Sequence, residues 1–180
     1  MLKITIPENE LYDEKNNEFV YVKAQEIQLE HSLLSISKWE SKWHKSFLST
    51  KNKTTEEVID YVRCMTITQN VDKRIYYSLS AENITKINNY IDDPMTATTI
   101  NGSIGNKPSR EIITSELIYY WMIAYNVPVE FEKWHINRLL TLIRVCSIKN
   151  APQKKMSKSE IMNRNAALNE ARRKALNSKG

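Results

Sequence analysis

The chain has 180 residues, 41% of them hydrophobic, and a formal net charge of +5. This length predicts one compact domain with an appendage, and the apolar content is sufficient for a core. No apolar run reaches the roughly 18 residues that a membrane-spanning helix needs, so no membrane partner is expected. The two cysteines, Cys64 and Cys146, imply no disulfide framework, which fits a reducing cytoplasm.

Charge is divided unevenly between a nearly neutral body and a basic C-terminal end. Residues 150–180 contain eight Lys or Arg and two Glu, whereas the other 149 residues carry 18 basic and 19 acidic groups. We therefore expect one globular domain over residues 1–150 and a basic helical tail over residues 151–180. Such a tail either meets an acidic partner or is simply solvated, and its removal should leave the body folded.

Short β-strands are predicted in the first 30 residues. Residues 2–6 alternate apolar and polar side chains, the period of a half-buried strand, and Pro7 ends the run. After a polar turn, residues 19–22 and 26–30 have the composition of two further strands. The pattern predicts a small antiparallel β-meander over residues 2–30, whose edges must be covered.

Helices are predicted over most of residues 32–149. The first contains Trp39 and Trp43, which stand at positions i and i+4 and should touch. Residues 54–57 have the Thr-x-x-Glu spacing of a capping box and open the next helix. Another short helix ends before Pro94, because the residue before proline disfavours the helical conformation.

A long loop and the most apolar part of the chain follow. Residues 94–109 have no hydrophobic period. Their Gly-x-x-Gly at 102–105 matches the nucleic-acid clamp of KH domains, but the βααβ frame of the KH fold is not predicted around it. A flexible loop is therefore the favoured interpretation. Residues 111–150 hold two apolar helical patterns in succession. The second is apolar around most of its circumference, which predicts burial on several sides. We expect this helical hairpin to form the core.

The residue types that carry catalysis and metal binding show no diagnostic spacing. His31, His44 and His135 have no second ligand at the spacing of a metal site. His135 is interpreted as a hydrogen-bonded core histidine and His44 as a solvated one. Ser35 and Lys38 match the Ser-x-x-Lys pattern of acyl-enzymes without its accompanying motifs. We therefore predict no enzymatic activity, metal or cofactor.

The basic tail holds the side chains best suited to contact phosphate. These are Lys154, Lys155, Arg172, Arg173 and Lys174. Single-strand binding also uses aromatic side chains that stack on bases, and the tail contains none. Nucleic acid is therefore less favoured as a partner than an acidic protein surface. A capping-box spacing at residues 157–160 predicts a helix, whose apolar stripe is too thin to stabilise it alone.

Seven segments carry a resemblance to known proteins. They are EHSLLSISKWESKW at 30–43, IDYVRCMTI at 59–67, DPMTATT at 93–99, REIITSELIYYWM at 110–122, EKWHINRLLTLIRVC at 132–146, KMSKSEI at 155–161 and ALNEARR at 167–173. Together they resemble one family of phage proteins, the tail assembly chaperones of tailed phages with long non-contractile tails. The resemblance spans nearly the whole chain.

The resemblance implies a non-catalytic assembly factor of the host cytoplasm that is absent from the finished virion. Such proteins bind the tape measure protein, keep it soluble and recruit tail tube subunits, and a longer form often arises by frameshifting. A tape measure protein is a long helix with an apolar face, which a hydrophobic groove can shield. Candidate groove residues are Trp39, Trp43, Tyr119 and Trp121, with core filling as the competing interpretation of each. Self-association is also left open.

The sequence thus predicts an α+β fold that is mainly helical: an N-terminal β-meander, a helical bundle and a basic C-terminal helix. Two other functions stay open. A structural virion protein, such as a head–tail connector or a minor tail subunit, would also combine a neutral body with a basic arm. A nucleic-acid-binding phage protein would use the basic tail, and its affinity would fall steeply with salt.

Overall fold

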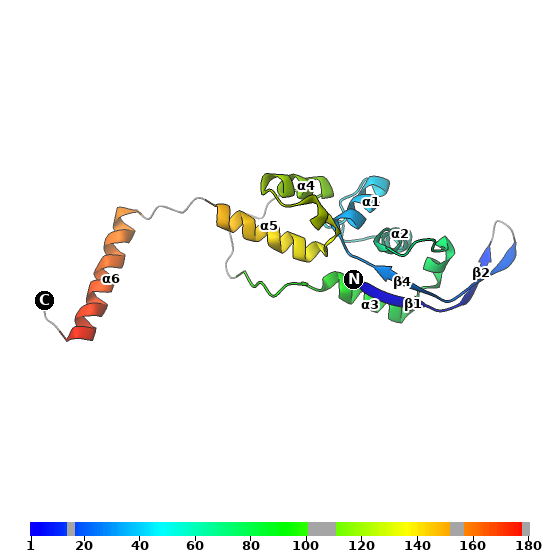
Figure 1. Cartoon of the computed structure of the whole chain (residues 1–180), viewed down its shortest axis with the longest axis horizontal. Coiled ribbons are helices and arrows are strands. Elements are labelled where there is room, and N and C mark those ends of the chain that lie inside the picture. The colour runs from blue at the N-terminus through cyan, green and yellow to red at the C-terminus, as the bar shows by residue number, and fades with distance from the viewer. Residues whose placement is uncertain (14–16, 101–110, 152–156, 178–180) are drawn as a thin grey trace. The chain divides into compact units, whose positions relative to one another are not determined.

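The computed structural model describes residues 1–13, 17–100, 111–151 and 157–177 (Figure 1). The strands are β1 (Leu2–Ile6), β2 (Asn9–Asp13), β3 (Glu18–Val22) and β4 (Gln25–Leu29). The α-helices are α1 (Leu33–Trp43), α2 (Thr55–Met65), α3 (Ala81–Asp92), α4 (Ser115–Ala124), α5 (Ile136–Asn150) and α6 (Lys158–Leu176), and two 3-10 helices are η1 (Lys73–Ser78) and η2 (Val129–Lys133). The predicted α+β, mainly helical class is confirmed. The chain divides into two compact units, Met1–Ile148, here called the body, and Lys149–Gly180, the tail unit.

The strands form one antiparallel ribbon with a break in its middle. β1 pairs with β4, and β2 pairs with β3. In both pairs the sequence positions of two facing residues sum to 31, as for Leu2 opposite Leu29 and Asp13 opposite Glu18. The register therefore continues across the break, where Pro7 has no backbone N–H to donate to a ladder. The predicted antiparallel region is present, but the first strand pairs with the last instead of with its sequence neighbour, as a meander would require.

The two halves of the ribbon differ in burial. Ile4, Ile6, Ile27 and Leu29 of the β1–β4 half are at most 3% exposed, whereas Phe19 of the β2–β3 half is 73% exposed. The chain after α2 covers the edge of β4: Glu30 N–H donates to the Met65 carbonyl at 2.9 Å, and Ile67 N–H donates to the Gln28 carbonyl at 2.8 Å. The β1–β4 half and Val22 at the end of β3 are thus part of the core, and the rest of the β2–β3 half extends beyond it (Figure 1).

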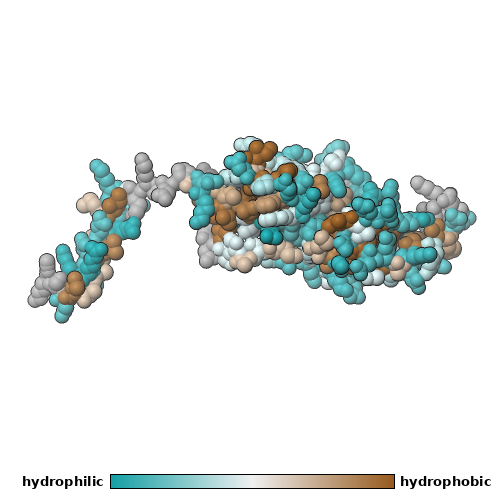
Figure 2. All heavy atoms as spheres, viewed as in Figure 1, coloured by the Kyte–Doolittle hydropathy of each residue, from teal (hydrophilic) through white to brown (hydrophobic). Residues whose placement is uncertain are grey.

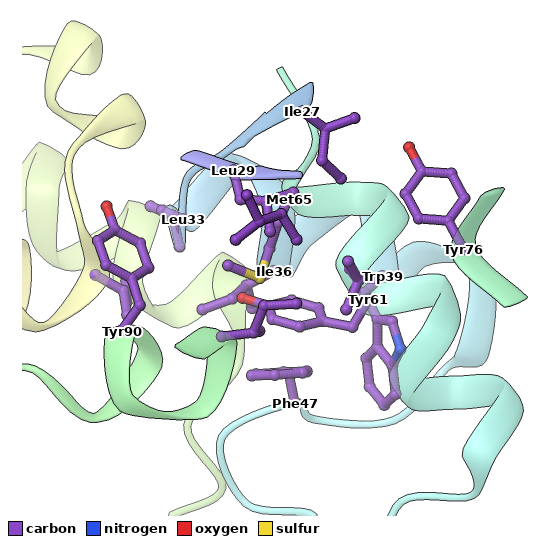
Figure 3. Close-up of a cluster of buried hydrophobic side chains, with 14 of the residues drawn as sticks. Ile27, Leu29, Leu33, Ile36, Trp39, Phe47, Tyr61, Met65, Tyr76 and Tyr90 are labelled. Atoms are coloured by element: carbon purple, nitrogen blue, oxygen red, sulfur yellow. The ribbon is translucent and has the colours of Figure 1, made fainter. Parts of the chain in front are cut away.

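Helix α1 is the centre of the body. It packs against α2, α4 and η2, and its Leu33, Ile36 and Trp39 are fully buried. Figure 3 shows these side chains together with others from β4, α2 and α3: Ile27, Leu29, Tyr61, Met65 and Tyr90. The Trp39 indole N–H donates to the Glu57 carbonyl at 2.9 Å, which ties α1 to α2. The core is therefore organised around α1 and not around residues 111–150.

A buried carboxylate fixes α4 against α1. Glu40 is 7% exposed, and its two oxygens accept the backbone N–H of Phe47 at 2.8 Å and of Ser115 at 2.7 Å. Ser115 is the first residue of α4, and a helix N-terminus favours negative charge through its free N–H groups. The one carboxylate therefore holds both the chain after α1 and the start of α4.

Helix α5 is less covered than its composition predicts. It buries Ile136, Leu139 and Ile143 on one side, while Leu142 and Val145 are half-exposed. The apolar residues at the half-exposed positions had suggested burial on several sides. Among the described residues, the core covers one side of α5, and Leu142 and Val145 instead line a hollow beside residues 95–98.

The tail unit contains α6. Its N-cap Ser157 and Glu160 form a reciprocal capping box, and every residue from Lys158 to Leu176 is exposed. The predicted helix start is confirmed. The Gly-x-x-Gly pattern at 102–105 and the candidate contacts Lys154 and Lys155 lie outside the described residues.

Candidate helix-binding groove

A groove between α2 and α3 is the candidate functional site of the body. Two adjoining hollows form it, of about 370 Å³ and about 570 Å³. Lys53, Val58 and Asn88 line both hollows, so the two are halves of one groove. The smaller half is mainly apolar and the larger half is mixed, which gives the groove an apolar end and a polar end.

The apolar half is built by α2, η1 and α3. Its buried surface includes Val62, Tyr76 and Ile87, while Val58 is 41% exposed and Ile84 is 43% exposed. Apolar side chains left open around a hollow offer a surface that the apolar face of an amphipathic helix can cover. The groove therefore has the chemistry of a helix-binding site.

The packing of α3 explains why this surface stays open. α3 contacts β1, and the Asn83 side-chain amide donates to the Thr5 carbonyl at 3.2 Å. The apolar stripe of α2 buries Tyr61, Val62 and Met65, but Val58 at its start stays open. Since α3 is anchored to the sheet, it does not close over that end of the stripe.

The polar half combines side chains from three parts of the chain. Lys51 and Lys53 come from the segment before α2, Asn88 from α3 and Asn137 from α5. The Asn137 amide donates to the backbone carbonyls of Ile91 at 3.0 Å and of Asp93 at 2.8 Å. Its N–H groups are therefore used to join α5 to α3, and the lysines are the cationic groups of this half.

His31 lies in this half as a neutral side chain. It is 2% exposed, and its Nδ1 is hydrogen-bonded to the Tyr61 hydroxyl. Burial, with the nearby His135 and Lys53, lowers the pKa of His31 to about 3. Burial also raises the pKa of the Tyr61 hydroxyl. At neutral pH this pair is therefore uncharged and gives the polar half a hydrogen-bonded wall without charge.

Lys53 is the cation that lies deepest in the groove. Its ammonium donates to the Thr50 carbonyl at 2.7 Å and lies 4.2 Å from the centre of the Phe47 ring. Burial lowers the pKa of this ammonium, while the Glu57 charge acts in the opposite direction. Glu57 itself is in contact with Lys45, whose ammonium is 2.6 Å from Oε1. Lys53 is thus partly desolvated and has an aromatic ring and a carbonyl as close partners.

His135 is a satisfied core histidine, as predicted. It is 5% exposed, and its Nε2 is 2.9 Å from the Tyr90 carbonyl oxygen, so Nε2 carries the proton. Nδ1 accepts the Asn137 N–H at 3.3 Å. Both ring nitrogens are occupied, and the two bonds fix one tautomer. His44, at the C-cap of α1 in the left-handed conformation, is exposed, as predicted.

None of the four predicted aromatic residues lines the groove. Trp39 is fully buried in the core. Trp43 lies 6.2 Å from it between ring centres, confirming the predicted neighbours, and its indole N–H donates to Asp60 at 2.9 Å. Tyr119 and Trp121 are half-buried on α4, and the Tyr119 hydroxyl donates to Glu132 at 2.8 Å. The structure therefore does not bring these four residues together as one binding surface.

The predicted basic residues that are described lie on α6. Arg172, Arg173 and Lys174 are exposed, and the Lys174 ammonium is 2.8 Å from the Glu170 carboxylate. Arg172 and Arg173 are consecutive, so their side chains leave the helix in different directions. The tail unit presents positive charge around its helix and not as one compact patch.

A second apolar surface lies on α4. Tyr120 is 63% exposed and Ile123 is 76% exposed, and Figure 2 shows apolar side chains gathered over α4 and α5. Glu116 is the only charged residue of α4. No residue of α4 lines either half of the α2–α3 groove, so this surface serves below as the control surface.

Sequence reasoning missed the groove, although part of its signal was present. Lys51 and Lys53 stand in a polar segment just before the capping box, and Val58 shares the apolar period of the helix that follows, so neither pattern marks a site. The contributions of Asn88 and Asn137 had no local signal, because α3 and α5 meet only through the tertiary structure.

Comparisons with protein-family models, with curated protein sequences and with solved structures found no match to this chain. None of the helices in the described ranges is both long and apolar enough to cross a membrane. Among the same described residues, no group of three or more His, Cys, Asp or Glu is arranged to hold a metal ion.

Proposed function

We propose that this protein is a non-catalytic tail assembly chaperone of a long-tailed phage, which binds and solubilises the tape measure protein and helps to recruit tail tube subunits. The α2–α3 groove is the observation that carries this proposal. It would receive the apolar face of a tape measure helix, and the complex would form in the host cytoplasm and leave no chaperone in the mature virion. The family resemblance of the sequence supplies the identity of the partner.

The groove suits an elongated apolar helix for a physical reason. A solitary helix with a continuous apolar face aggregates, because that face finds no other cover in water. Val58 of α2 and Ile84 of α3 both line the groove and are partly exposed, so both offer apolar contacts to such a face. Covering apolar surface contributes about 25 cal/mol for each Å² removed from water, which favours a partner that covers the exposed apolar side chains of the groove.

The test is co-expression of the full chain with the tape measure protein, followed by size-exclusion chromatography of the soluble fraction. We expect the tape protein to be soluble only with this chain and to co-elute with it. Val58→Glu with Ile84→Glu should abolish co-elution, because the charges oppose burial of an apolar helix face. Both positions are substantially exposed, so the variant should fold.

The matched control is Tyr120→Glu with Ile123→Glu on α4. These residues, one aromatic and one aliphatic, are even more exposed, but they lie outside the groove. Co-elution that survives the α4 change and is lost with the groove change supports the proposal. A tape protein that stays insoluble beside the unmodified chain contradicts it.

A structural virion protein is the second candidate, favoured by the β2–β3 half of the ribbon. Tyr12, Phe19 and Tyr21 are 51%, 73% and 55% exposed there, and strands with open edges add readily to a neighbouring sheet. This function predicts the protein in purified particles, at a fixed number of copies for each virion, which mass spectrometry of the particles would detect.

A further inference from the structure

Lys53, the deepest cation of the groove, is not paired with a carboxylate of the described residues. Within the described ranges, Lys53 makes no ion pair with a carboxylate: its ammonium is close to the Thr50 carbonyl and the Phe47 ring. The nearest acidic side chain that affects it, Glu57, is bonded to Lys45 at 2.6 Å and to the Thr54 N–H at 2.7 Å. A carboxylate that reaches a partly buried ammonium is attracted to it more than at the open surface, because water and salt screen the two charges less there.

The other groups around this end leave room for such a carboxylate. Lys51 lines the same hollow and adds a second positive charge, and Asp92, at the C-terminal end of α3, contributes the one negative charge of the lining. His31 and Tyr61 are neutral there, as described above. The hollow of about 570 Å³ is large enough to take a side chain or a helix end.

We infer that the groove selects an amphipathic helix whose apolar stripe ends in carboxylate side chains, and that Lys51 and Lys53 bind those carboxylates. This inference rests on the proposed function and adds to it the charge pattern of the partner. The apolar half of the groove binds the stripe, and the polar half determines which segment of a long helix is held and in which direction it runs.

The test uses the full chain and three synthetic helical peptides with the same leucine stripe. One carries two glutamates in its first turn, one carries them in its last turn, and one has glutamines at both places. Fluorescence anisotropy at low salt measures the three affinities. We expect one of the glutamate peptides to bind about tenfold more tightly than the glutamine peptide, as a charge-assisted contact to a shielded lysine predicts.

Two variants assign the preference to the two lysines. Lys51→Gln with Lys53→Met removes both charges and keeps an unbranched side chain over the Phe47 ring, and it should make the three affinities equal. Lys38→Gln, an exposed lysine on α1 outside the groove, should leave the preference unchanged. Circular dichroism of each variant confirms that it is folded.

The outcomes separate this inference from the proposed function. Equal affinities of all three peptides for the unmodified chain overturn the inference, while co-elution with the tape protein would still uphold the chaperone. A glutamate preference that persists in the double variant also overturns it, because the charge would then be sensed elsewhere. Absence of peptide binding overturns it as well, and loss of tape solubilisation in addition would remove the proposed function.

Discussion

Helices α2 and α6 begin in the same way and lie in opposite environments. Thr54 with Glu57, and Ser157 with Glu160, form reciprocal capping boxes at their N-termini. α2 then buries five side chains, and α6 buries none although it is eight residues longer (19 against 11). A cap and a helical period are therefore sufficient to place a helix, whereas its contribution to stability depends on the surface it meets.

Removing Trp39, the α1 side chain that packs against α2, should lower the free energy of unfolding most. Trp39→Ala deletes a fully buried indole beneath α2 and leaves the Glu57 carbonyl without its 2.9 Å hydrogen bond. We expect the free energy of unfolding to fall by about 3–5 kcal/mol in urea denaturation. Leu168→Ala, on the exposed stripe of α6, should change it by less than about 0.5 kcal/mol. Equal losses of stability in the Trp39 and Leu168 variants would contradict the difference drawn between α2 and α6.

Protonation of His31, which is hydrogen-bonded to Tyr61 of α2, should have an intermediate effect on the free energy of unfolding. The pKa of His31 is lowered to about 3 by burial and by His135 and Lys53, against about 6.5 in an unfolded chain. The stabilisation from neutral His31 is complete above pH 6.5 and is lost as the pH falls toward 3, because the unfolded chain then binds the extra proton. Between pH 8 and pH 5 the free energy of unfolding should fall by about 2 kcal/mol from this group.

The measurement is urea denaturation at several pH values in that range, above the region where carboxylates titrate. His31→Gln should flatten the dependence, whatever its effect on stability at pH 8. His44→Gln, at an exposed position, should keep it. A slope that survives in the His31 variant would mean that another group takes up the proton.

Removing the N-cap side chains should change the free energy of unfolding least, and it compares α2 with α6 directly. Thr54→Ala should lower the free energy of unfolding of the body by about 1 kcal/mol, since α2 is part of its core. Ser157→Ala should leave that transition unchanged and increase hydrogen exchange within α6 alone. Deleting residues 151–180 should also leave the transition unchanged. A truncated chain that unfolds would show that the tail is part of the core.

Local patterns predicted the positions of most elements. The alternation in residues 2–6, the capping boxes at 54–57 and 157–160 and the stop before Pro94 all correspond to observed strands and helix ends. β2 was not predicted, because Asn9–Asp13 is rich in residues that disfavour strands. Its pairing with β3, in register with the β1–β4 half, holds it extended.

The candidate site was far less predictable. Trp39 and Trp43 were proposed for a groove because large aromatic residues suit both cores and binding surfaces, and nothing local separates the two uses. The groove depends instead on Val58, which has the same character as its buried neighbours in α2. Whether an apolar residue is covered is decided by elements far away in the chain, here by the anchoring of α3 on β1.

The sequence by itself determined the class of the fold, the starts of α2 and α6 and the separation of a neutral body from a basic tail. These features follow from side-chain period, capping chemistry and charge, which act over a few residues. Only the tertiary structure decided that α1 is the central helix, that the first strand pairs with the fourth, and that two lysines and two asparagines surround one hollow. These relations join residues that are distant in sequence. They arise from packing, because the position of each element depends on the surfaces of the elements that it contacts.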